Sequence, residues 1–434
     1  MFGAAQTDLL HPMNSVSPAT SQSETGRNSA GFWKQLASSL TRVTSHGRYV
    51  PVIDGLRCIA IMAVMLFHLN ESLVVSRPEL EAPARSTTLF QVLKVGSIGV
   101  PLFFSISGFI LALPFLEAHH QQKPLNLKRY WLRRLTRLEP PYLLNLLLIT
   151  GLLVIVRGDS IAELGWPLLA SMGYLHNLIY GEMSRINCVA WSLEIEVQFY
   201  LLMPLLVFGY LAAGPQRRWW LLAVIMMLCL VKIGLELSGT YPGSLQPASF
   251  WFRRLMLSLP WYLEYFLVGI WLADWYFTDW QSRPRVSAAW DWAGIVCWPL
   301  LVASQWHSEL RHCLPIVILP AYMAALRGSV LNTIFSWTPF AIVGGMCYTL
   351  YLYHFYVISF VSKITIPRLD GISYPVALLI QSSLIVPLTL MFGAILFRYI
   401  ERPCMQWRPW EQRSAGASHG LTADLLVNQA DPVR

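Results

Sequence analysis

Two residues with chemically active side chains interrupt the apolar stretch VIDGLRCIAIMAVMLFHLNESL, residues 52–73. Arg57 is near its start, and His68 follows eleven residues later. Eleven residues turn an α-helix through about 1100° and advance it by about 16 Å, so the two side chains share one face at different depths. Arginine is permanently cationic and binds phosphate in a bidentate manner, whereas histidine titrates near neutral pH and serves as a general base. The pair predicts an anion site connected to a proton acceptor.

Each of these two residues also has a purely structural interpretation. Arg57 alone can be an interfacial anchor whose charge reaches the headgroup region. His68 alone can be a hydrogen-bonded interior residue, although ionisable groups at membrane depth are costly and often functional. Their alignment on one face favours the functional interpretation of His68. For Arg57, the structural and the functional interpretations both remain open.

A second cationic group lies in KRYWLRRLTRLEPPY, residues 128–142. Arg134 and Arg137 are three residues apart and therefore share a helix face. Pro140 and Pro141 are expected to break or redirect the helix as it enters the bilayer. A basic loop that only sets orientation is the plain alternative. The functional alternative is an anion site at the cytoplasmic mouth of the membrane domain.

Carboxylates and a second histidine lie within other apolar stretches. In WSLEIEVQFYLLMPLL, Glu194 and Glu196 are two residues apart. They point about 200° apart around a helix and cannot face the same site. One is expected to face the bundle interior and the other the outer interface, and spacing does not say which. His354, in CYTLYLYHFYV, falls in the depth range of His68.

Other polar and small residues in the apolar stretches receive structural interpretations. Lys232 and Glu236 are four residues apart and are interpreted as an ion pair within one helix. Glu264 receives no role. The small residues of GSIGVPLFFSISGFILALPF, residues 96–115, are interpreted as helix-packing positions, although the lining of a ligand tunnel would use the same residue types.

The composition identifies the elements that must hold these residues. Of the 434 residues, 55% are hydrophobic and 13% are charged, against about 25% charged in soluble domains. Apolar stretches long enough to cross a bilayer recur along the chain. The sequence therefore predicts an all-α polytopic membrane protein with about ten transmembrane helices, at residues 52–73, 96–116, 138–156, 189–212, 218–237, 256–277, 288–305, 310–327, 340–361 and 375–399.

The distribution of basic residues predicts the orientation. Lys and Arg show a roughly twofold excess in the tails and alternate loops, with six of them in 117–137 alone, which places both termini in the cytoplasm. This placement explains the net charge of +8 without nucleic acid. We expect a multi-pass protein of the cell membrane, with the bacterial inner membrane as its setting.

The chain divides into three predicted regions. Residues 1–47 are a flexible polar cytoplasmic tail, residues 48–403 are the membrane domain, and residues 404–434 are a cytoplasmic C-terminal tail. Residues 157–188 are long and partly apolar for a loop, which is consistent with a re-entrant or surface helix on the outer side. The seven cysteines include no C-x-x-C pair and no metal spacing, so no metal site is predicted. Cys188 and Cys313 fall near the outer face, where they can pair, but a coincidental placement is favoured.

Six motifs, in order, resemble the membrane-bound acyltransferase family 3, which includes O-acetyltransferases of lipopolysaccharide, peptidoglycan, exopolysaccharides, nodulation factors and macrolides. The resemblance runs from about residue 49 to residue 403. Cys347 stands where serine is common, a departure not expected to affect the chemistry. The motifs are Asp54-Gly55-Leu56-Arg57 with His68, GVPLFFSISGF from Gly99, Arg134-x-x-Arg137-x-x-Pro140-x-Tyr142, Trp191-Ser192-Leu193-x-x-Glu196-x-x-Phe199-Tyr200, YTLYLYH ending at His354, and Glu401-Arg402-Pro403.

The resemblance implies a ten-helix core and an acyl-coenzyme A donor, most often acetyl-coenzyme A, with no permanently bound cofactor. It selects Glu196 over Glu194 as the inward-facing carboxylate. The implied catalytic residues are His68, Glu196 and His354, and the implied donor-binding residues are Arg57, Arg134 and Arg137. The implied supporting residues are Asp54, Tyr142, Trp191, Ser192 and Tyr200.

These roles combine into one predicted mechanism. The arginines receive the phosphates of acyl-coenzyme A from the cytoplasm, and the pantetheine arm extends along the first helix towards His68. His68 acts as general base for an acceptor hydroxyl, and Glu196 or His354 orients His68 or the acceptor. An acyl-histidine intermediate remains an alternative.

The predicted acceptor is a hydroxyl of a cell-surface glycan or related molecule, lipid-linked acceptors included. A transporter or exporter of a small anionic or acylated metabolite is the alternative from another class, although no internal repeat supports it. A non-catalytic membrane partner of a glycan-assembly complex is a third alternative.

Overall fold

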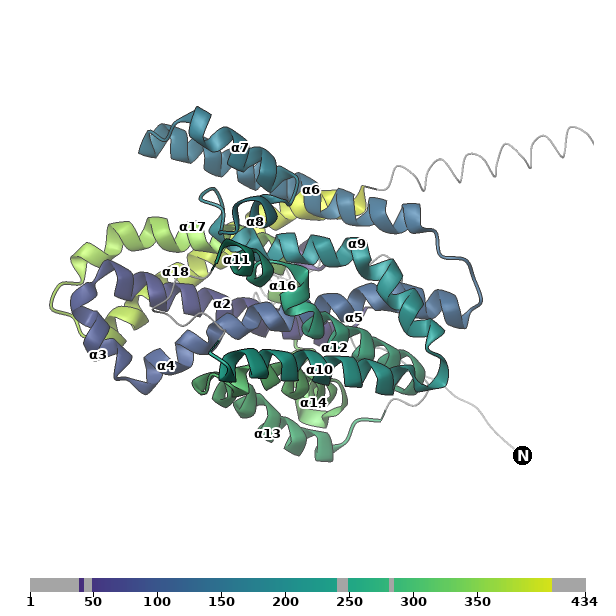
Figure 1. Ribbon diagram of the computed structural model, residues 1–434. Coiled ribbons are helices and arrows are strands. Elements are labelled where there is room, and N and C mark those ends of the chain that lie inside the picture. The colour runs from purple at the N-terminus through teal and green to yellow at the C-terminus, as the bar shows by residue number, and fades with distance from the viewer. Residues whose placement is uncertain (1–38, 43–48, 240–248, 281–284, 408–434) are drawn as a thin grey trace, which may run out of the picture. The chain divides into compact units, whose positions relative to one another are not determined.

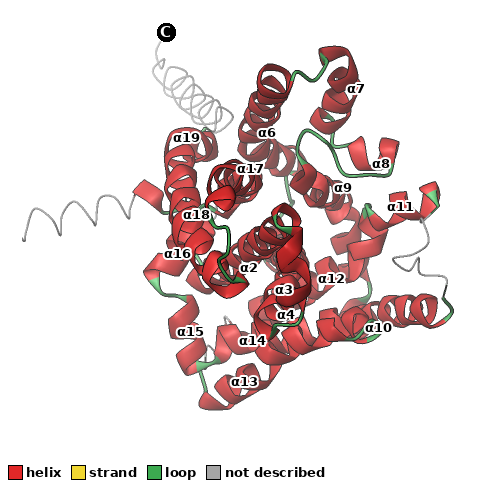
Figure 2. Ribbon diagram, turned by 90° about the vertical axis from the view of Figure 1, so that its left-hand side faces the viewer, coloured by secondary structure: helices red, strands yellow, loops and turns green. Residues whose placement is uncertain are grey.

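The computed structural model describes residues 39–42, 49–239, 249–280 and 285–407. The two predicted tails therefore lie almost entirely outside the described residues. Every regular element in the described ranges is a helix and none is a strand, which confirms the all-α prediction (Figure 2). All the helices named below belong to one compact unit, Leu40–Arg434.

Helices long and apolar enough to cross a membrane confirm a multi-pass protein. Seven helical segments in the described ranges meet this condition, and nine do so if each of two bent pairs counts as one span. The bent pairs are α14 (Leu314–Arg327) with α15 (Ser329–Phe335), at 89°, and α16 (Thr338–Gly345) with α17 (Cys347–Thr365), at 73°. The seven segments contain α2 (Pro51–Ser76), α5 (Gly99–His120), α6 (Leu127–Leu152), α9 (Trp191–Ala212), α10 (Arg217–Leu237), α12 (Leu259–Trp275) and α18 (Tyr374–Leu396).

The predicted count of about ten exceeds the upper count of nine by one short helix. The span predicted at 288–305 is α13 (Ala288–Ala303), whose 16 residues are not among the candidate spans. The segment 157–188 contains helices, as predicted. They are α7 (Ile161–Met172) and α8 (His176–Tyr180). The remaining short α-helices are α3 (Glu81–Arg85), α4 (Thr88–Lys94), α11 (Phe250–Met256) and α19 (Arg402–Gln406).

The start of α6 corrects a predicted boundary. The basic residues expected in a loop ending at 137 are helical from Leu127, where the Asn126 side chain caps the helix by accepting a hydrogen bond of 2.9 Å from the Arg129 amide. Pro140 and Pro141 lie inside the helix and do not end it. Leucine and arginine are good helix formers, and they carry the helix through to the prolines. Arg134 and Arg137 are therefore fixed on a helix.

α2 runs through the centre of the bundle, where it contacts α5, α16 and α17 (Figures 1 and 2). Glycines allow the closest approaches, because a Cβ at Gly108 would lie 2.1 Å from the Phe266 carbonyl oxygen. A Cβ at Gly269 would lie 2.1 Å from the Ser105 carbonyl oxygen in return. These contacts join α5 to α12 and agree with the packing interpretation of the small residues.

The break between α16 and α17 lies directly against the first turns of α2. A Cβ at Gly344, in the last turn of α16, would lie 1.6 Å from the Asp54 carbonyl oxygen. A Cβ at Gly55 would lie 1.9 Å from the Phe335 carbonyl oxygen. This packing fixes the start of α17 beside Arg57, and both contribute to the cavity described next.

Candidate active site

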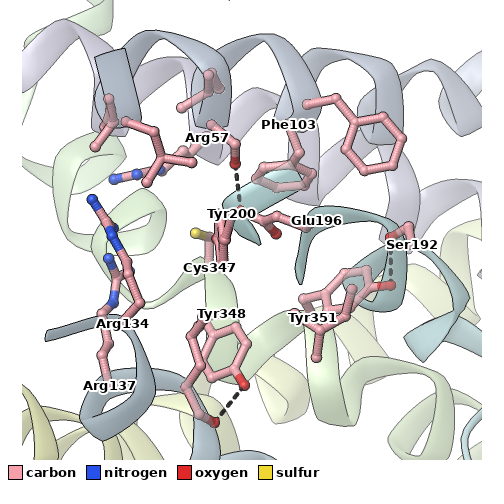
Figure 3. A pocket seen from close by; sticks show the side chains of 17 residues that line it. Arg57, Phe103, Arg134, Arg137, Ser192, Glu196, Tyr200, Cys347, Tyr348 and Tyr351 are labelled. Atoms are coloured by element: carbon pink, nitrogen blue, oxygen red, sulfur yellow. Dashed lines mark hydrogen bonds between the residues drawn. The ribbon is translucent and has the colours of Figure 1, made fainter. Parts of the chain in front are cut away.

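A cavity of about 780 Å³, counting the space at its opening, lies between α2, α5, α6, α9 and α17 (Figure 3). Cationic, acidic, hydroxyl and apolar side chains all contribute to its wall. They are Arg57, Phe103, Phe104, Ile106, Ser107, Ile110, Leu111, Arg134, Arg137, Leu138, Ser192, Leu193, Glu196, Tyr200, Cys347, Tyr348 and Tyr351.

Three arginines give the cavity its charge. Arg57 is 7% exposed, and its Nη1 donates a hydrogen bond of 2.6 Å to Asp54 Oδ1. The Arg134 guanidinium lies 5.9 Å from the centroids of the Tyr130 and Tyr200 rings. Within the described part of the chain, neither Arg134 nor Arg137 forms an ion pair with a carboxylate. The cavity wall is therefore cationic on the α6 side and suits an anion.

Glu196 is the carboxylate on the cavity wall. The Ser107 hydroxyl donates to Glu196 Oε1 over 2.5 Å, and the Tyr200 hydroxyl donates to the same oxygen. Two donors on one oxygen fix the orientation of the carboxyl group. Figure 3 shows Glu196 beside Tyr200, between the arginine side of the cavity and Ser192.

Glu194 does not share this environment, as its position on the helix predicted. It is 1% exposed, and its Oε2 accepts a hydrogen bond of 2.8 Å from the amide of Asn177 in α8. The prediction that the second glutamate faces the outer interface is wrong for Glu194, because this side chain is buried and is bonded to the segment that contains α8. The carboxylate therefore anchors that segment to α9.

The two predicted histidines lie together but outside the cavity wall. The rings of His68 in α2 and His354 in α17 have centroids 5.2 Å apart. His354 is fully buried, with Nδ1 2.8 Å from the Tyr351 carbonyl oxygen and 3.1 Å from that of Leu350. A carbonyl oxygen only accepts, so Nδ1 carries the hydrogen and the neutral ring has a free lone pair on Nε2. In the described structure Nε2 has no hydrogen-bond partner.

Tyr351 connects the cavity to the histidine pair. It contributes to the cavity wall, and its ring centroid lies 6.1 Å from that of His354, one turn further along α17. Its hydroxyl is 2.7 Å from Ser192 Oγ and donates to the Val189 carbonyl oxygen. Arg57 therefore lies on the cavity wall, whereas His68 lies in the histidine pair outside it.

The supporting residues divide between the cavity and the surrounding core. Asp54 pairs with Arg57, and both Ser192 and Tyr200 are on the cavity wall. Tyr142 is fully buried outside the wall, and its hydroxyl donates to the Ser171 carbonyl oxygen over 3.1 Å. The Trp191 ring lies outside the cavity wall and packs against the Tyr262 ring, with centroids 5.5 Å apart.

Sequence reasoning did not single out several residues of the cavity wall. Ser107 lies in a motif that was interpreted as packing, and only its place beside Glu196 distinguishes it. Tyr348 and Tyr351 lie in the motif that ends at His354. Cys347, set aside as a neutral departure, is part of the wall, and its sulfur is visible there in Figure 3.

The interpretation of Lys232 and Glu236 as a pair within one helix is wrong. Lys232 forms its ion pair with Glu264 of α12, the residue left without a role. Glu236 instead lies 3.3 Å from His312 Nε2. Both interactions join α10 to a neighbouring segment, because the side chains turn towards other helices instead of along their own.

Metal-ligating residues do not cluster in the described ranges: no group of three or more His, Cys, Asp and Glu side chains forms a candidate metal site there. The cysteines are free thiols, Cys188 and Cys313 included.

The fold and this region define a class: a helical multi-pass membrane protein with a cationic cavity beside a histidine pair, one member of which is fully buried. The sequence profile of the family described as "Acyltransferase domain" matches residues 50–407. The chain belongs to this acyltransferase family, which confirms the predicted resemblance.

Curated relatives agree with this membership. The chain is 29% identical over 394 residues to the peptidoglycan O-acetyltransferase OatA of Listeria monocytogenes, covering 84% of this chain and 57% of that protein. It is 27% identical over 384 residues to the O-acetyltransferase OatA of Staphylococcus aureus strain NCTC 8325, with 82% and 57% covered. A putative O-acetyltransferase of Staphylococcus aureus strain COL is 26% identical over 397 residues, with 83% and 59% covered. The chain thus spans less than three fifths of the length of these relatives. No solved structure matches it significantly.

Proposed function

We propose that this chain is a membrane O-acyltransferase that moves an acyl group, acetyl in the simplest case, from cytoplasmic acyl-coenzyme A to a hydroxyl of a cell-surface glycan. The observation that carries the proposal is the arginine-lined cavity beside the His68–His354 pair. The named activity of the relatives supports O-acetyl transfer and a glycan acceptor. Lipid-linked glycans are included among the acceptors.

The arginines supply the donor site in this proposal. Coenzyme A carries several phosphate charges at one end, and guanidinium groups bind phosphate through strong charge-assisted hydrogen bonds. Arg134 and Arg137 are without carboxylate partners in the described structure and lie on the same wall of the cavity. The predicted orientation of α6 places this wall towards the cytoplasm, where acyl-coenzyme A is made.

The histidine pair supplies proton transfer. An imidazole takes the proton of the acceptor hydroxyl as the hydroxyl oxygen attacks the thioester carbonyl, and the thiolate of coenzyme A leaves and is protonated. The free lone pair on His354 Nε2 supports a proton-accepting role for the pair, with His68 as the predicted base. Glu196, held by Ser107 and Tyr200, lies on the cavity wall where it can orient the bound thioester.

The test uses the purified chain in lipid nanodiscs with radiolabelled acetyl-coenzyme A and soluble glycan fragments. Release of coenzyme A together with label in the glycan is the expected result. A transporter would instead move its substrate across vesicles without any acyl donor. Substrate flux without donor consumption would therefore contradict the proposal.

A further inference from the structure

Residues 186–189, here named the strap, lie between α8 and α9 and are largely buried although they are not part of an α-helix. Ile186 and Asn187 are fully buried, and Val189 is 4% exposed. Buried backbone that is not helical needs hydrogen-bond donors from other parts of the protein for its carbonyl oxygens. The side chains that supply these donors show which helix the strap holds.

Two tyrosines of α17 bind the two ends of the strap. The Tyr351 hydroxyl donates to the Val189 carbonyl oxygen. The Tyr356 hydroxyl donates to the Ile186 carbonyl oxygen. The five steps from Tyr351 to Tyr356 advance an α-helix by about 7.5 Å. The strap is therefore bonded to α17 on both sides of His354.

The middle of the strap is connected to the same part of α17 through two asparagines. Asn187 Nδ2 donates to Asn145 Oδ1 of α6 over 2.7 Å. Asn145 Nδ2 in turn donates to the Leu352 carbonyl oxygen over 3.2 Å. Both asparagines are fully buried, and buried amides are costly unless they are hydrogen-bonded. The two side chains thus join the strap, α6 and α17 in one chain of hydrogen bonds.

The Tyr351 hydroxyl adds α9 to this network. A phenol carries one hydrogen, and Tyr351 gives it to the Val189 carbonyl oxygen, which can only accept. The Ser192 hydroxyl therefore donates to the Tyr351 hydroxyl oxygen over 2.7 Å (Figure 3). Ser192 lies in the first turn of α9, so this turn is fixed against α17 as well.

These contacts hold the backbone on which the His354 ring depends. The hydrogen on His354 Nδ1 points to the carbonyl oxygens of Leu350 and Tyr351. The strap network binds Tyr351 and Leu352 in the same turn. This turn follows the 73° break, so α16 does not continue into it as a straight helix. Lipid is as apolar as the side chains between membrane helices, so hydrogen bonds between helices contribute to where each helix lies.

We propose that the strap is a positioning element for His354, with Asn187 and Tyr356 as the positioning residues that hold its turn of α17. The role of His354 in proton transfer rests on the proposed function. The intact network keeps the imidazole beside that of His68, with ring centroids 5.2 Å apart. When one hydrogen bond of the network is removed, this turn opens more often and the ring leaves its position for part of the time.

The proposal predicts two changes of opposite sign at His354. Diethyl pyrocarbonate acylates a neutral imidazole nitrogen and releases ethanol and carbon dioxide. Loss of one hydrogen bond should make this reaction at His354 about two- to tenfold faster, because the buried ring becomes accessible more often. The same loss should lower kcat for acetyl transfer by about tenfold, because a displaced base is poorly aligned. The KM for acetyl-coenzyme A should stay constant, since Asn187 and Tyr356 are not on the cavity wall.

The experiment compares Tyr356→Phe and Asn187→Ala with wild type, using the full chain in nanodiscs. Mass spectrometry of the α17 peptide gives the acylation rate of His354, and the α2 peptide gives that of His68 as the internal reference. Tyr356→Phe keeps the ring and loses only the hydroxyl, so it decides the question even if Asn187→Ala does not fold. Tyr322→Phe is the matched control, because its buried hydroxyl donates to the Leu102 carbonyl oxygen over 3.0 Å and joins α14 to α5. It should change neither the His354 rate nor kcat.

The outcomes separate the strap from the proposed function. Faster acylation of His354 with lower kcat and constant KM supports the positioning role. Unchanged acylation of His354 in folded Tyr356→Phe overturns it, and so does faster acylation with unchanged kcat, since the strap would then only shield the ring. Equal effects of Tyr322→Phe also overturn it, because they would reflect a general loss of stability. A wild-type chain that transfers no acetyl contradicts the proposed function, while the acylation rates still decide whether the strap holds His354.

Discussion

His354 in α17 and His68 in α2 lie with ring centroids 5.2 Å apart, and a backbone carbonyl 2.8 Å from Nδ1 fixes the hydrogen position of His354. This arrangement leaves the unprotonated Nε2 of a fully buried ring free to accept a proton. The histidine pair is next to the cavity, because Tyr351 contributes to the cavity wall and its ring lies close to that of His354. The geometry suits a proton acceptor beside the cavity.

We therefore expect His68→Ala and His354→Ala each to lower acetyl transfer by about 10²- to 10⁴-fold, the usual contribution of a general base. The expected loss is in kcat, because neither residue is on the wall of the donor cavity. The measurement is single-turnover transfer from labelled acetyl-coenzyme A. His307→Ala, at an exposed position, is the control. Near wild-type turnover by His68→Ala would remove His68 from the mechanism.

Arg134→Ala and Arg137→Ala are expected to weaken the donor without abolishing chemistry. Each removes one cation that faces the cavity, so the KM for acetyl-coenzyme A should rise by about tenfold or more, while kcat changes less. The difference from wild type should shrink as salt is added, because screening weakens the lost interaction. Lys128→Ala, exposed on the same helix, tests whether surface charge alone explains the effect. An equal rise in KM for Lys128→Ala would contradict a specific donor site.

The sequence predicts the spanning helices well because hydrocarbon imposes a length and an apolar composition on each of them. It also predicts that Arg57 and His68 share a face, since α2 is one continuous helix. What it misses depends on contacts between helices. The partner of Lys232 is on another helix, and no local spacing reveals Glu264.

The composition of the cavity wall was predicted less completely for the same reason. Ser107 becomes notable only through its hydrogen bond to Glu196, 89 positions away in the chain. Cys347 is the first residue of α17, directly after the sharp break between α16 and α17. Gly344 and Gly345 precede this break, but their presence in the sequence does not predict it. Helix periodicity gives the face of a residue, but not which neighbouring helix that face meets.

Glu196 and Glu194 offer a contrast between a site residue and a structural one. Glu196→Gln keeps the size of the side chain but removes the charge that Ser107 and Tyr200 hold in place, so we expect transfer to fall by about 100-fold with little change in melting temperature. Glu194→Gln weakens the bond to the Asn177 amide, so we expect a lower melting temperature and a smaller loss of transfer. Transfer rates and melting curves for both variants decide the question. Equal behaviour of the two variants would show that Glu196 has no special role.

Two adjacent glycines provide the sharpest test of how the break in α16–α17 supports the site. A Cβ at Gly344 would lie 1.6 Å from the Asp54 carbonyl oxygen, a contact that only a backbone shift can relieve. At Gly345 the nearest atom would be Arg42 Cβ at 3.5 Å, an ordinary van der Waals distance.

Gly344→Ala is therefore expected to destabilise the protein by about 4 kcal/mol or more, a range reserved for severe steric conflicts. It should also displace α17 from Arg57 and so raise the KM for the donor. Gly345→Ala should change stability by less than about 1 kcal/mol, because helical glycine-to-alanine changes at uncrowded positions are mild. Melting curves and donor KM values for both variants test this directly. If Gly344→Ala melted like Gly345→Ala, the close contact between the break and the start of α2 would be wrong, and with it the positioning of the cavity wall.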